Sequence, residues 1–178
     1  VIRIAPGAQI RRSIALINMM AGGSAHASFV RSLVMVGEGA SVTLTETAGA
    51  CAPAATQAND ALVVKIGDGA RLDYVARVVA QGEGALALHS LLATIGADAA
   101  FNAFAFLPDP TTVRRQIFAR LNGRNSRVNF GGLSLLRGKE HADTTLVVDH
   151  AVPNCVSREF FRHILDHEAT GVFQGKVV

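Results

Sequence analysis

The sequence has no tryptophan, one tyrosine and only two cysteines among its 178 residues. Cys51 and Cys155 form neither a CxxC pair nor a disulfide framework, so a reducing compartment is the simpler interpretation. No apolar run approaches the roughly 20 residues of a membrane-spanning helix, and no signal-peptide pattern opens the chain. We therefore expect a cytoplasmic protein that does not bind membranes.

Charged residues are also scarce, at 17% of the chain, whereas hydrophobic residues make up 49%. This composition excludes a disordered chain and favours a single well-buried domain over residues 1–178. Seventeen Lys and Arg residues against fourteen Asp and Glu residues give a net charge of +3, which does not indicate nucleic-acid binding. Because the sequence starts at Val1 and ends at Val178 within an apolar run, we expect it to lack the flanking segments of a longer parent protein.

Sustained helical periodicity is absent: no capped segment keeps apolar residues at i, i+3, i+4 and i+7. Instead, a glycine-bearing turn recurs at a period of about 30 residues. The four turns are Pro6-Gly7-Ala8, Gly37-Glu38-Gly39-Ala40, Gly67-Asp68-Gly69-Ala70 and Gly96-Ala97-Asp98-Ala99. Between the turns, the residues alternate as β-strands require.

Two strands fit into each repeat. The alternating residues that define them include Val42-x-Leu44, Leu62-x-Val64-x-Ile66, Leu72-x-Tyr74, Leu86-x-Leu88-x-Ser90-x-Leu92, Phe101-x-Ala103, Val113-x-Arg115-x-Ile117, Leu133-x-Leu135 and Thr145-x-Val147. Ala48–Ala58 is interpreted as a flexible excursion, Leu107–Pro110 as a corner rich in proline, and Ser157–Leu165 as either one helical turn or a strand.

These features predict an all-β fold: a parallel β-helix, or solenoid, of about six coils of roughly 30 residues with two strands each. Each coil buries its apolar face only by stacking on its neighbours. A β-sandwich is the competing architecture, but a sandwich does not need a constant period.

Candidate metal ligands and acid–base groups gather in the last third of the chain, Lys139–Val178. They are His141, Asp143, Asp149, His150, Cys155, His163, His167 and Glu168. Their spacing matches no closed zinc site. Because imidazole and thiolate ligands suit iron chemistry, His150 and Cys155, separated by Pro153-Asn154, are the candidate metal ligands; a structural turn with an inert cysteine is the alternative.

Other patterns favour structural interpretations. Gly37-x-Gly39 and Gly67-x-Gly69 lack the third glycine and the helix of a dinucleotide-binding loop, so we interpret them as turns. The sequence has no GxSxG or HExxH motif of a hydrolase. The only concentration of basic residues is interpreted as a solvated strand face rather than a phosphate track; it comprises Arg114, Arg115, Arg120, Arg124 and Arg127.

The chain resembles the SufB/SufD family of β-helical scaffold proteins of the SUF iron–sulfur cluster assembly system. The resemblance rests on Gly131-Gly132-Leu133, Asp143-Thr144, Asp149-His150, Pro153-Asn154-Cys155, Ser157-Arg158-Glu159 and Gly171–Val177, with Val36–Ala40, Glu46-Thr47 and Asn59 extending it over nearly the whole chain. Within the family, Phe160–Leu165 and Val172–Gly175 are similar to the SufD branch.

The resemblance implies a right-handed β-helix and a non-catalytic scaffold subunit. Such a subunit pairs with a SufB-like paralogue, or with itself, and recruits the SufC ATPase, while the full complex assembles an iron–sulfur cluster transiently. The family's cluster-ligating histidine and SufC-binding helices are expected outside residues 1–178, so no catalytic, cofactor-binding or metal-binding residue and no resident cofactor is carried over. The alternatives are a carbohydrate-binding or carbohydrate-cleaving β-helix and a purely structural solenoid.

Overall fold

A computed structural model describes residues 1–20, 24–51, 55–108 and 110–178, and in these ranges the chain forms two parallel β-sheets and no helix. The seven-stranded sheet contains β1 (Ile2–Ile4), β3 (His26–Val36), β5 (Thr56–Ile66), β7 (Leu86–Ile95), β9 (Thr112–Leu121), β11 (His141–Asp149) and β13 (Thr170–Val177). The six-stranded sheet contains β2 (Ile14–Met20), β4 (Ser41–Cys51), β6 (Arg71–Gln81), β8 (Ala100–Pro108), β10 (Arg127–Leu136) and β12 (Val156–Leu165).

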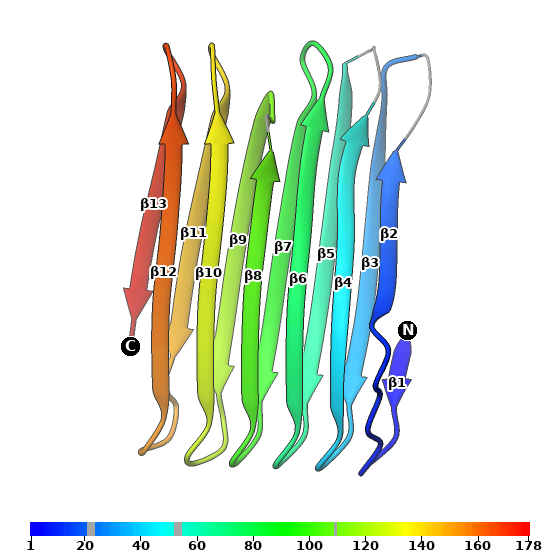
Figure 1. The fold of residues 1–178 in the computed structure, drawn as a ribbon, viewed down its shortest axis with the longest axis vertical. Coiled ribbons are helices and arrows are strands. Elements are labelled where there is room, and N and C mark those ends of the chain that lie inside the picture. The colour runs from blue at the N-terminus through cyan, green and yellow to red at the C-terminus, as the bar shows by residue number, and fades with distance from the viewer. Residues whose placement is uncertain (21–23, 52–54, 109) are drawn as a thin grey trace.

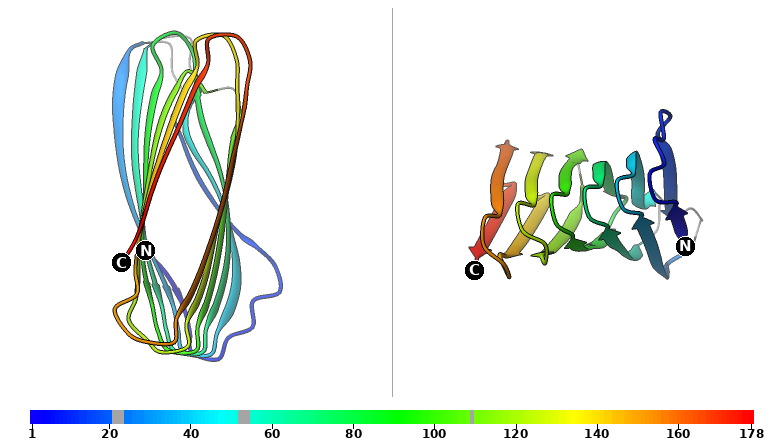
Figure 2. Two further views of the ribbon diagram at one scale, coloured as in Figure 1. Left: turned by 90° about the vertical axis from the view of Figure 1, so that its left-hand side faces the viewer. Right: turned by 90° about the horizontal axis from the view of Figure 1, so that it is seen from below.

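Consecutive strands lie in opposite sheets, and each strand pairs with the strands one coil before and one coil after it, except at the ends of the two sheets, where β1, β2, β12 and β13 have one such partner. In Figure 1 the even-numbered strands lie in front and run upward, the odd-numbered strands run downward behind them, and the chain advances from right to left. This path is a right-handed coil. Figure 2 shows the two sheets facing each other, joined at both ends by turns. The predicted β-solenoid is therefore confirmed. The described strands and turns include no apolar helix long enough to span a bilayer.

Gly37, Gly67 and Gly96 open three successive turns from odd-numbered to even-numbered strands, and Gly123 is the second residue of the next such turn, because the backbones of these turns stack in close contact. A Cβ atom on Gly67 would lie 2.8 Å from the backbone nitrogen of Glu38, and one on Gly123 would lie 1.8 Å from that of Ala97. No real Cβ atom fits at such distances. The constant spacing of these glycines thus has a steric origin.

In the turns that open at Gly37, Gly67 and Gly96, the third residue has a positive φ angle, which glycine adopts without strain. Gly39 and Gly69 have φ angles of 63° and 64°. The prediction that aligned Gly7 with Gly37 is wrong by two residues. Ile4 pairs with Val36, so Gly7, which has a φ angle of 71°, occupies the position of Gly39. The first coil is therefore slightly longer than the predicted repeat.

The alternating residues of most predicted strands face the core, but in three strands the predicted set faces outward. In β7 the buried residues are Ala87, His89, Leu91, Ala93 and Ile95, not the leucines and serine between them. Likewise, Leu133 and Leu135 in β10, and Thr145 and Val147 in β11, lie on the outer faces. These strands carry apolar residues on both faces, so alternation alone does not identify the buried one.

Three smaller predictions were also tested. Ser157–Leu165 is strand, within β12. The Ala48–Ala58 excursion is largely wrong, because β4 continues to Cys51 and β5 begins at Thr56; residues 52–54 lie outside the described residues. The Leu107–Pro110 corner is confirmed where β8 ends at Pro108, although Asp109 lies outside the described residues.

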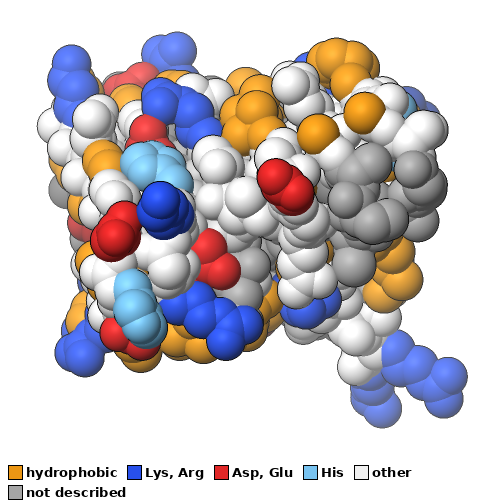
Figure 3. All heavy atoms as spheres, turned by 90° about the horizontal axis from the view of Figure 1, so that it is seen from above, with side chains coloured by type: hydrophobic (Ala, Val, Ile, Leu, Met, Phe, Trp, Pro, Cys, Tyr) orange, Lys and Arg blue, Asp and Glu red, His pale blue; other side chains and the backbone are white. Residues whose placement is uncertain are grey.

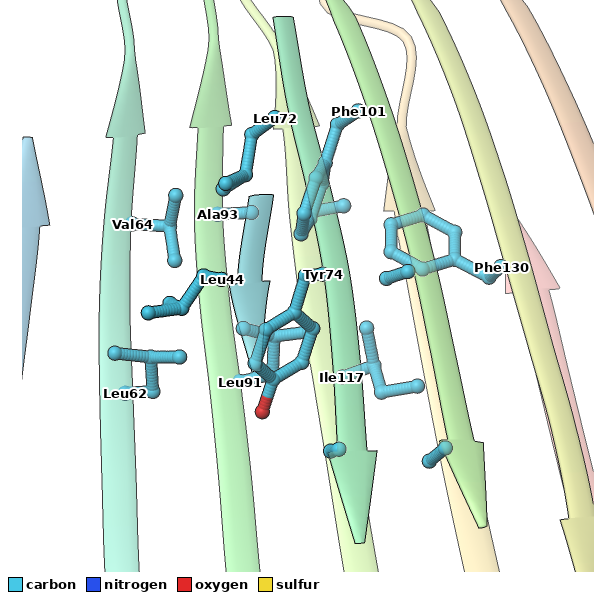
Figure 4. Packing of buried hydrophobic residues seen from close by; sticks show 14 of the residues in the cluster. Leu44, Leu62, Val64, Leu72, Tyr74, Leu91, Ala93, Phe101, Ile117 and Phe130 are labelled. Atoms are coloured by element: carbon cyan, nitrogen blue, oxygen red, sulfur yellow. The ribbon is translucent and has the colours of Figure 1, made fainter. Parts of the chain in front are cut away.

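The core lies between the two sheets and runs the length of the coil. Leu72, Phe101 and Ile117 are fully buried, and Figure 4 shows their side chains in the interior between the strands of the two sheets. The rings of Phe101 and Phe130 pack edge to face, with centroids 5.7 Å apart. Among these apolar side chains, Tyr74 points a hydroxyl group into the interior. This hydroxyl leads to the polar part of the core.

Candidate functional site

A column of polar side chains lies inside the solenoid. The register of the seven-stranded sheet pairs Asp60 of β5 with His89 of β7, His89 with Arg115 of β9, and Arg115 with Thr144 of β11. Each residue is at most 4% exposed. Because paired residues in parallel strands point to the same side, the four side chains form one buried column, one from each coil.

Glu46 of β4 reaches toward this column from the opposite sheet. Its Oε2 atom lies 3.1 Å from Nε2 of His89 and accepts a short hydrogen bond from the hydroxyl of Tyr74. Its Oε1 atom accepts a hydrogen bond of 3.2 Å from Nδ2 of Asn18. Since a carboxylate only accepts hydrogen bonds, Nε2 of His89 carries a proton. Nδ1 of His89 is buried and has no partner among the described residues.

Two carboxyl groups in this network have pKa values shifted in opposite directions. Burial acts to raise the pKa of Glu46, but the hydrogen bond and charge of His89, with the bonds from Tyr74 and Asn18, hold it below its ordinary value. Burial raises the pKa of Asp60 to about 6; the charge of His89 acts to lower this pKa, and the charge of Glu46 acts to raise it. Glu46 thus keeps its charge while Asp60 takes up protons near neutral pH.

Arg115 is the largest fully buried side chain of the protein's described part. Its Nε and Nη2 atoms have no hydrogen-bond partner among the described residues. Burial lowers the pKa of Arg115, whereas Tyr74 and Glu46 act in the opposite direction. In the six-stranded sheet, Ala76 and Ala105 follow Glu46 at the paired positions of the next two coils. Their small side chains leave space for the long side chain of Arg115, which comes from the other sheet.

The prediction of a solvated basic strand is wrong for Arg115 and right for its neighbours. Arg114 and Arg120 point outward from β9, where they form ion pairs of 2.6 Å with Asp143 and 3.3 Å with Asp149. Arg115 points inward because alternate residues of a strand face opposite sides. One strand therefore carries arginines with opposite environments.

The enclosed network does not have the accessibility of an active site. Tyr74 and His89 are each 1% exposed. A cavity of about 240 Å³ near the first coils reaches only the edge of the network, at Asn18 and Asp60. The network can therefore exchange protons at that edge, whereas its acid–base groups at Tyr74 and His89 are closed to a substrate.

The candidate metal ligands His150 and Cys155 lie at the two ends of the turn between β11 and β12. The Sγ atom of Cys155 lies 3.3 Å from Oγ of Ser126 and 3.4 Å from the carbonyl oxygen of Gly123, in the stacked turns. The backbone nitrogen of His150 donates to the carbonyl of Val178, and its Nε2 atom is buried without a described partner. Within the described ranges, no group of three His, Cys, Asp or Glu residues could hold a metal ion.

Of the remaining candidates, His141 begins β11 and Glu168 is exposed in the turn between β12 and β13. Asp143 and Asp149 hold the arginines of β9, and His167 contacts Asp166 at an exposed turn. His163 packs over Gly171, where a Cβ would lie 2.7 Å from its ring, and burial lowers the pKa of this histidine. The side chain of Cys51 lies outside the described residues.

The sequence contains a periodic signal for the polar column. Asp60, His89, Arg115 and Thr144 recur at nearly the repeat length, once in each coil. The prediction missed this series because it assigned the outer face of β7 to the core, which hid His89, and because it assigned Arg115 to solvent.

Comparison with known proteins gives one match. The family model described as SUF system FeS cluster assembly, SufBD core domain, matches residues 18–178. No curated protein and no solved structure matches the chain.

Proposed function

The chain belongs to the family of SufBD core domains of the SUF iron–sulfur cluster assembly system, and we propose that it acts there as a non-catalytic scaffold subunit. The family match over residues 18–178 is the observation that carries this proposal. Two observations favour a scaffold over an enzyme: the acid–base groups of the polar column are enclosed in the core, and Asp143 and Asp149 are engaged in surface ion pairs.

We propose further that the subunit is of the SufD type and works with a SufB-like paralogue and the SufC ATPase. The segments similar to the SufD branch, Phe160–Leu165 and Val172–Gly175, lie in β12 and β13. They meet in the last coil, where the rings of Phe161 and Phe173 stack with centroids 4.6 Å apart. The cluster is the cargo of the full complex, and its ligands are proposed to lie outside residues 1–178.

A carbohydrate-cleaving β-helix would need unengaged acidic groups together on one sheet face. The acidic residues on the outer faces of the described strands are instead paired: Asp73 with Arg71, Asp143 with Arg114, and Asp149 with Arg120. These ion pairs do not favour that alternative.

The test is affinity purification of the complete parent chain, followed by anaerobic iron and sulfide analysis of the complex. We expect an ABC-type ATPase and a paralogous β-helix protein to co-purify in stoichiometric amounts. Purification without the ATPase would contradict the proposal. Stoichiometric cluster binding by residues 1–178 alone would contradict the proposed location of the ligands.

A further inference from the structure

The outer face of the six-stranded sheet carries a large excess of arginine. We call the outward-facing side chains of β6, β8, β10 and β12 the even face. Five arginines and one aspartate are the only ionisable residues of this face: Arg71, Asp73, Arg77, Arg127, Arg158 and Arg162. All four strands are fully described, and their outer faces contain no lysine, glutamate or histidine.

On the opposite outer face the arginines and aspartates of β9 and β11 pair with each other and single cations remain on β3, β5 and β13, whereas the even face groups its unpaired arginines. On the even face, Asp73 is held by both Arg71 at 2.9 and 2.8 Å and Asn102 at 2.6 Å. Arg77, Arg158 and Arg162 form no ion pair with any residue in the described ranges. The even face therefore has a net positive charge available to a partner.

Between these arginines lies an apolar slot. The register aligns Val75, Phe104, Gly131 and Phe160 in one outward column. Phe104 and Phe160 are 42% and 57% exposed, whereas Gly131 between them has no side chain. A cavity of about 370 Å³ opens there. The guanidinium of Arg162 lies 5.0 Å from the ring centroid of Phe160, which orients both groups at the edge of the slot.

We propose that the even face is a docking surface for an acidic protein partner. The partner inserts an apolar side chain between Phe104 and Phe160 and sets carboxylates against Arg77, Arg158 and Arg162. This inference is independent of the proposed role in cluster assembly, because it rests on the charge and shape of this face alone.

The composition favours a protein partner over a nucleic acid or a lipid surface. Protein interfaces are rich in arginine and aromatic residues and poor in lysine and glutamate, as this face is. Four strands of about ten residues cover a footprint of about 33 by 19 Å, or about 600 Å². That footprint approaches the roughly 800 Å² that each partner buries in a stable interface.

The absence of tryptophan from the sequence allows a direct test. Phe104 on the even face and Phe118 on the opposite face are both 42% exposed, so Phe104→Trp and Phe118→Trp give matched single fluorophores. Each variant is titrated with polyglutamate, a glutamate–tyrosine random copolymer, single-stranded polythymidine, and phosphatidylcholine vesicles containing phosphatidylserine. Excitation at the red edge avoids the tyrosines of the copolymer.

We expect the copolymer to change the fluorescence of the Phe104→Trp variant and to bind it about tenfold more tightly than polyglutamate does, since an aromatic anchor adds to the charge. The Phe118→Trp variant should not respond. Adding the three substitutions Arg77→Gln, Arg158→Gln and Arg162→Gln to the Phe104→Trp variant should weaken its binding of the copolymer about 10- to 100-fold. The control triple variant Arg11→Gln, Arg12→Gln and Arg124→Gln loses the same charge elsewhere and should weaken it less than about threefold.

Three outcomes would overturn the proposal. Equal responses of the two tryptophan variants would mean that binding is not specific to the even face. If the two triple variants lost equal affinity for the copolymer, binding would depend on the net charge of the protein and not on the even face. Tighter binding of polythymidine or of the vesicles than of the copolymer would assign the face to a nucleic acid or to a membrane.

Discussion

Two columns of inward-facing residues run side by side in the seven-stranded sheet, one polar and one apolar. The polar column is Asp60, His89, Arg115 and Thr144; the apolar column, two residues farther along each strand, is Leu62, Leu91, Ile117 and Leu146. The strands are the same and both columns are buried. Only the chemistry of the side chains differs.

The comparison separates stability from register. Each buried leucine contributes about 1.5–3 kcal/mol through burial, but one leucine can replace another if the coils stack out of order. A buried polar residue loses its interactions with water, and only hydrogen bonds and charges of particular partners offset that cost in free energy. His89 finds Glu46 only when β7 lies beside β5 in the sheet opposite β4. We infer that the apolar column supplies stability and that the polar column specifies coil order.

The largest expected effect is that of Glu46→Ala. Removing this carboxylate leaves the hydroxyl of Tyr74, the ring of His89 and the charge of Arg115 without their common partner. We expect a loss of about 3–5 kcal/mol in the free energy of unfolding, measured by urea denaturation. Glu46→Gln, which keeps an acceptor oxygen, should lose less. A loss below about 1 kcal/mol would show that the polar column does not depend on Glu46.

Leu91→Ala probes the apolar column at the same coil. Leu91 is fully buried, so the deletion should cost about 3 kcal/mol through lost burial and the cavity it leaves. The control is Leu92→Ala, one residue later on the outer face and 40% exposed, which should cost less than about 1 kcal/mol. Equal losses at the two positions would contradict the assignment of the faces of β7.

Asp60→Asn tests the pH dependence of the polar column. The pKa of Asp60 is raised from 3.8 to about 6 in the folded protein. The folded state therefore binds this proton more tightly than the unfolded state, and the contribution of Asp60 to stability falls as the pH rises through this window. Relative to the native protein, the variant should gain up to about 3 kcal/mol between pH 4 and pH 7.

The measurement for Asp60→Asn is urea denaturation across this pH range. The control is Asp98→Asn, at an exposed turn with a φ angle of 55° that asparagine also tolerates. Because this control makes the same chemical change at an exposed aspartate, subtracting its profile isolates the part of the pH dependence that comes from the buried site of Asp60. No remaining pH dependence after this subtraction would mean that Asp60 keeps its ordinary pKa.

Arg115→Met should have the smallest effect. Methionine keeps much of the buried volume, and two of the guanidinium nitrogens have no described partner to lose. We expect the free energy of unfolding to stay within about 1 kcal/mol of the native value, at or above it. A loss of 3 kcal/mol or more by urea denaturation would show that Arg115 is a paired member of the network.

The repeat could be predicted from the sequence because its cause is local and steric. Gly67 and Gly123 admit no side chain where one turn stacks on the previous turn, so glycine recurs in the stacked turns up to Gly123, although the turn at residues 150–155 has none. Asp98 takes the position of Gly69 because a short polar residue also tolerates a positive φ angle.

The polar network could not be predicted in the same way. Its contacts join β4, β6 and β7 across the two sheets, at separations that alternation within one strand does not reveal. In β7, leucines on both faces made the buried face ambiguous, and in β9 the adjacent Arg114 and Arg115 look alike in sequence although one is outside and the other inside. Ligation of a metal by His150 and Cys155 stays a prediction.

The stacked glycine turns also make the protein modular. Gly67 and Gly96 hold equivalent positions in successive turns, so excision of residues 68–96 would join two matching halves of a turn and shorten the solenoid by one coil. The excised coil carries Tyr74 and His89, and its loss would set Asp60 directly beside Arg115. A backbone built from interchangeable units thus encloses a polar interior whose units are not interchangeable.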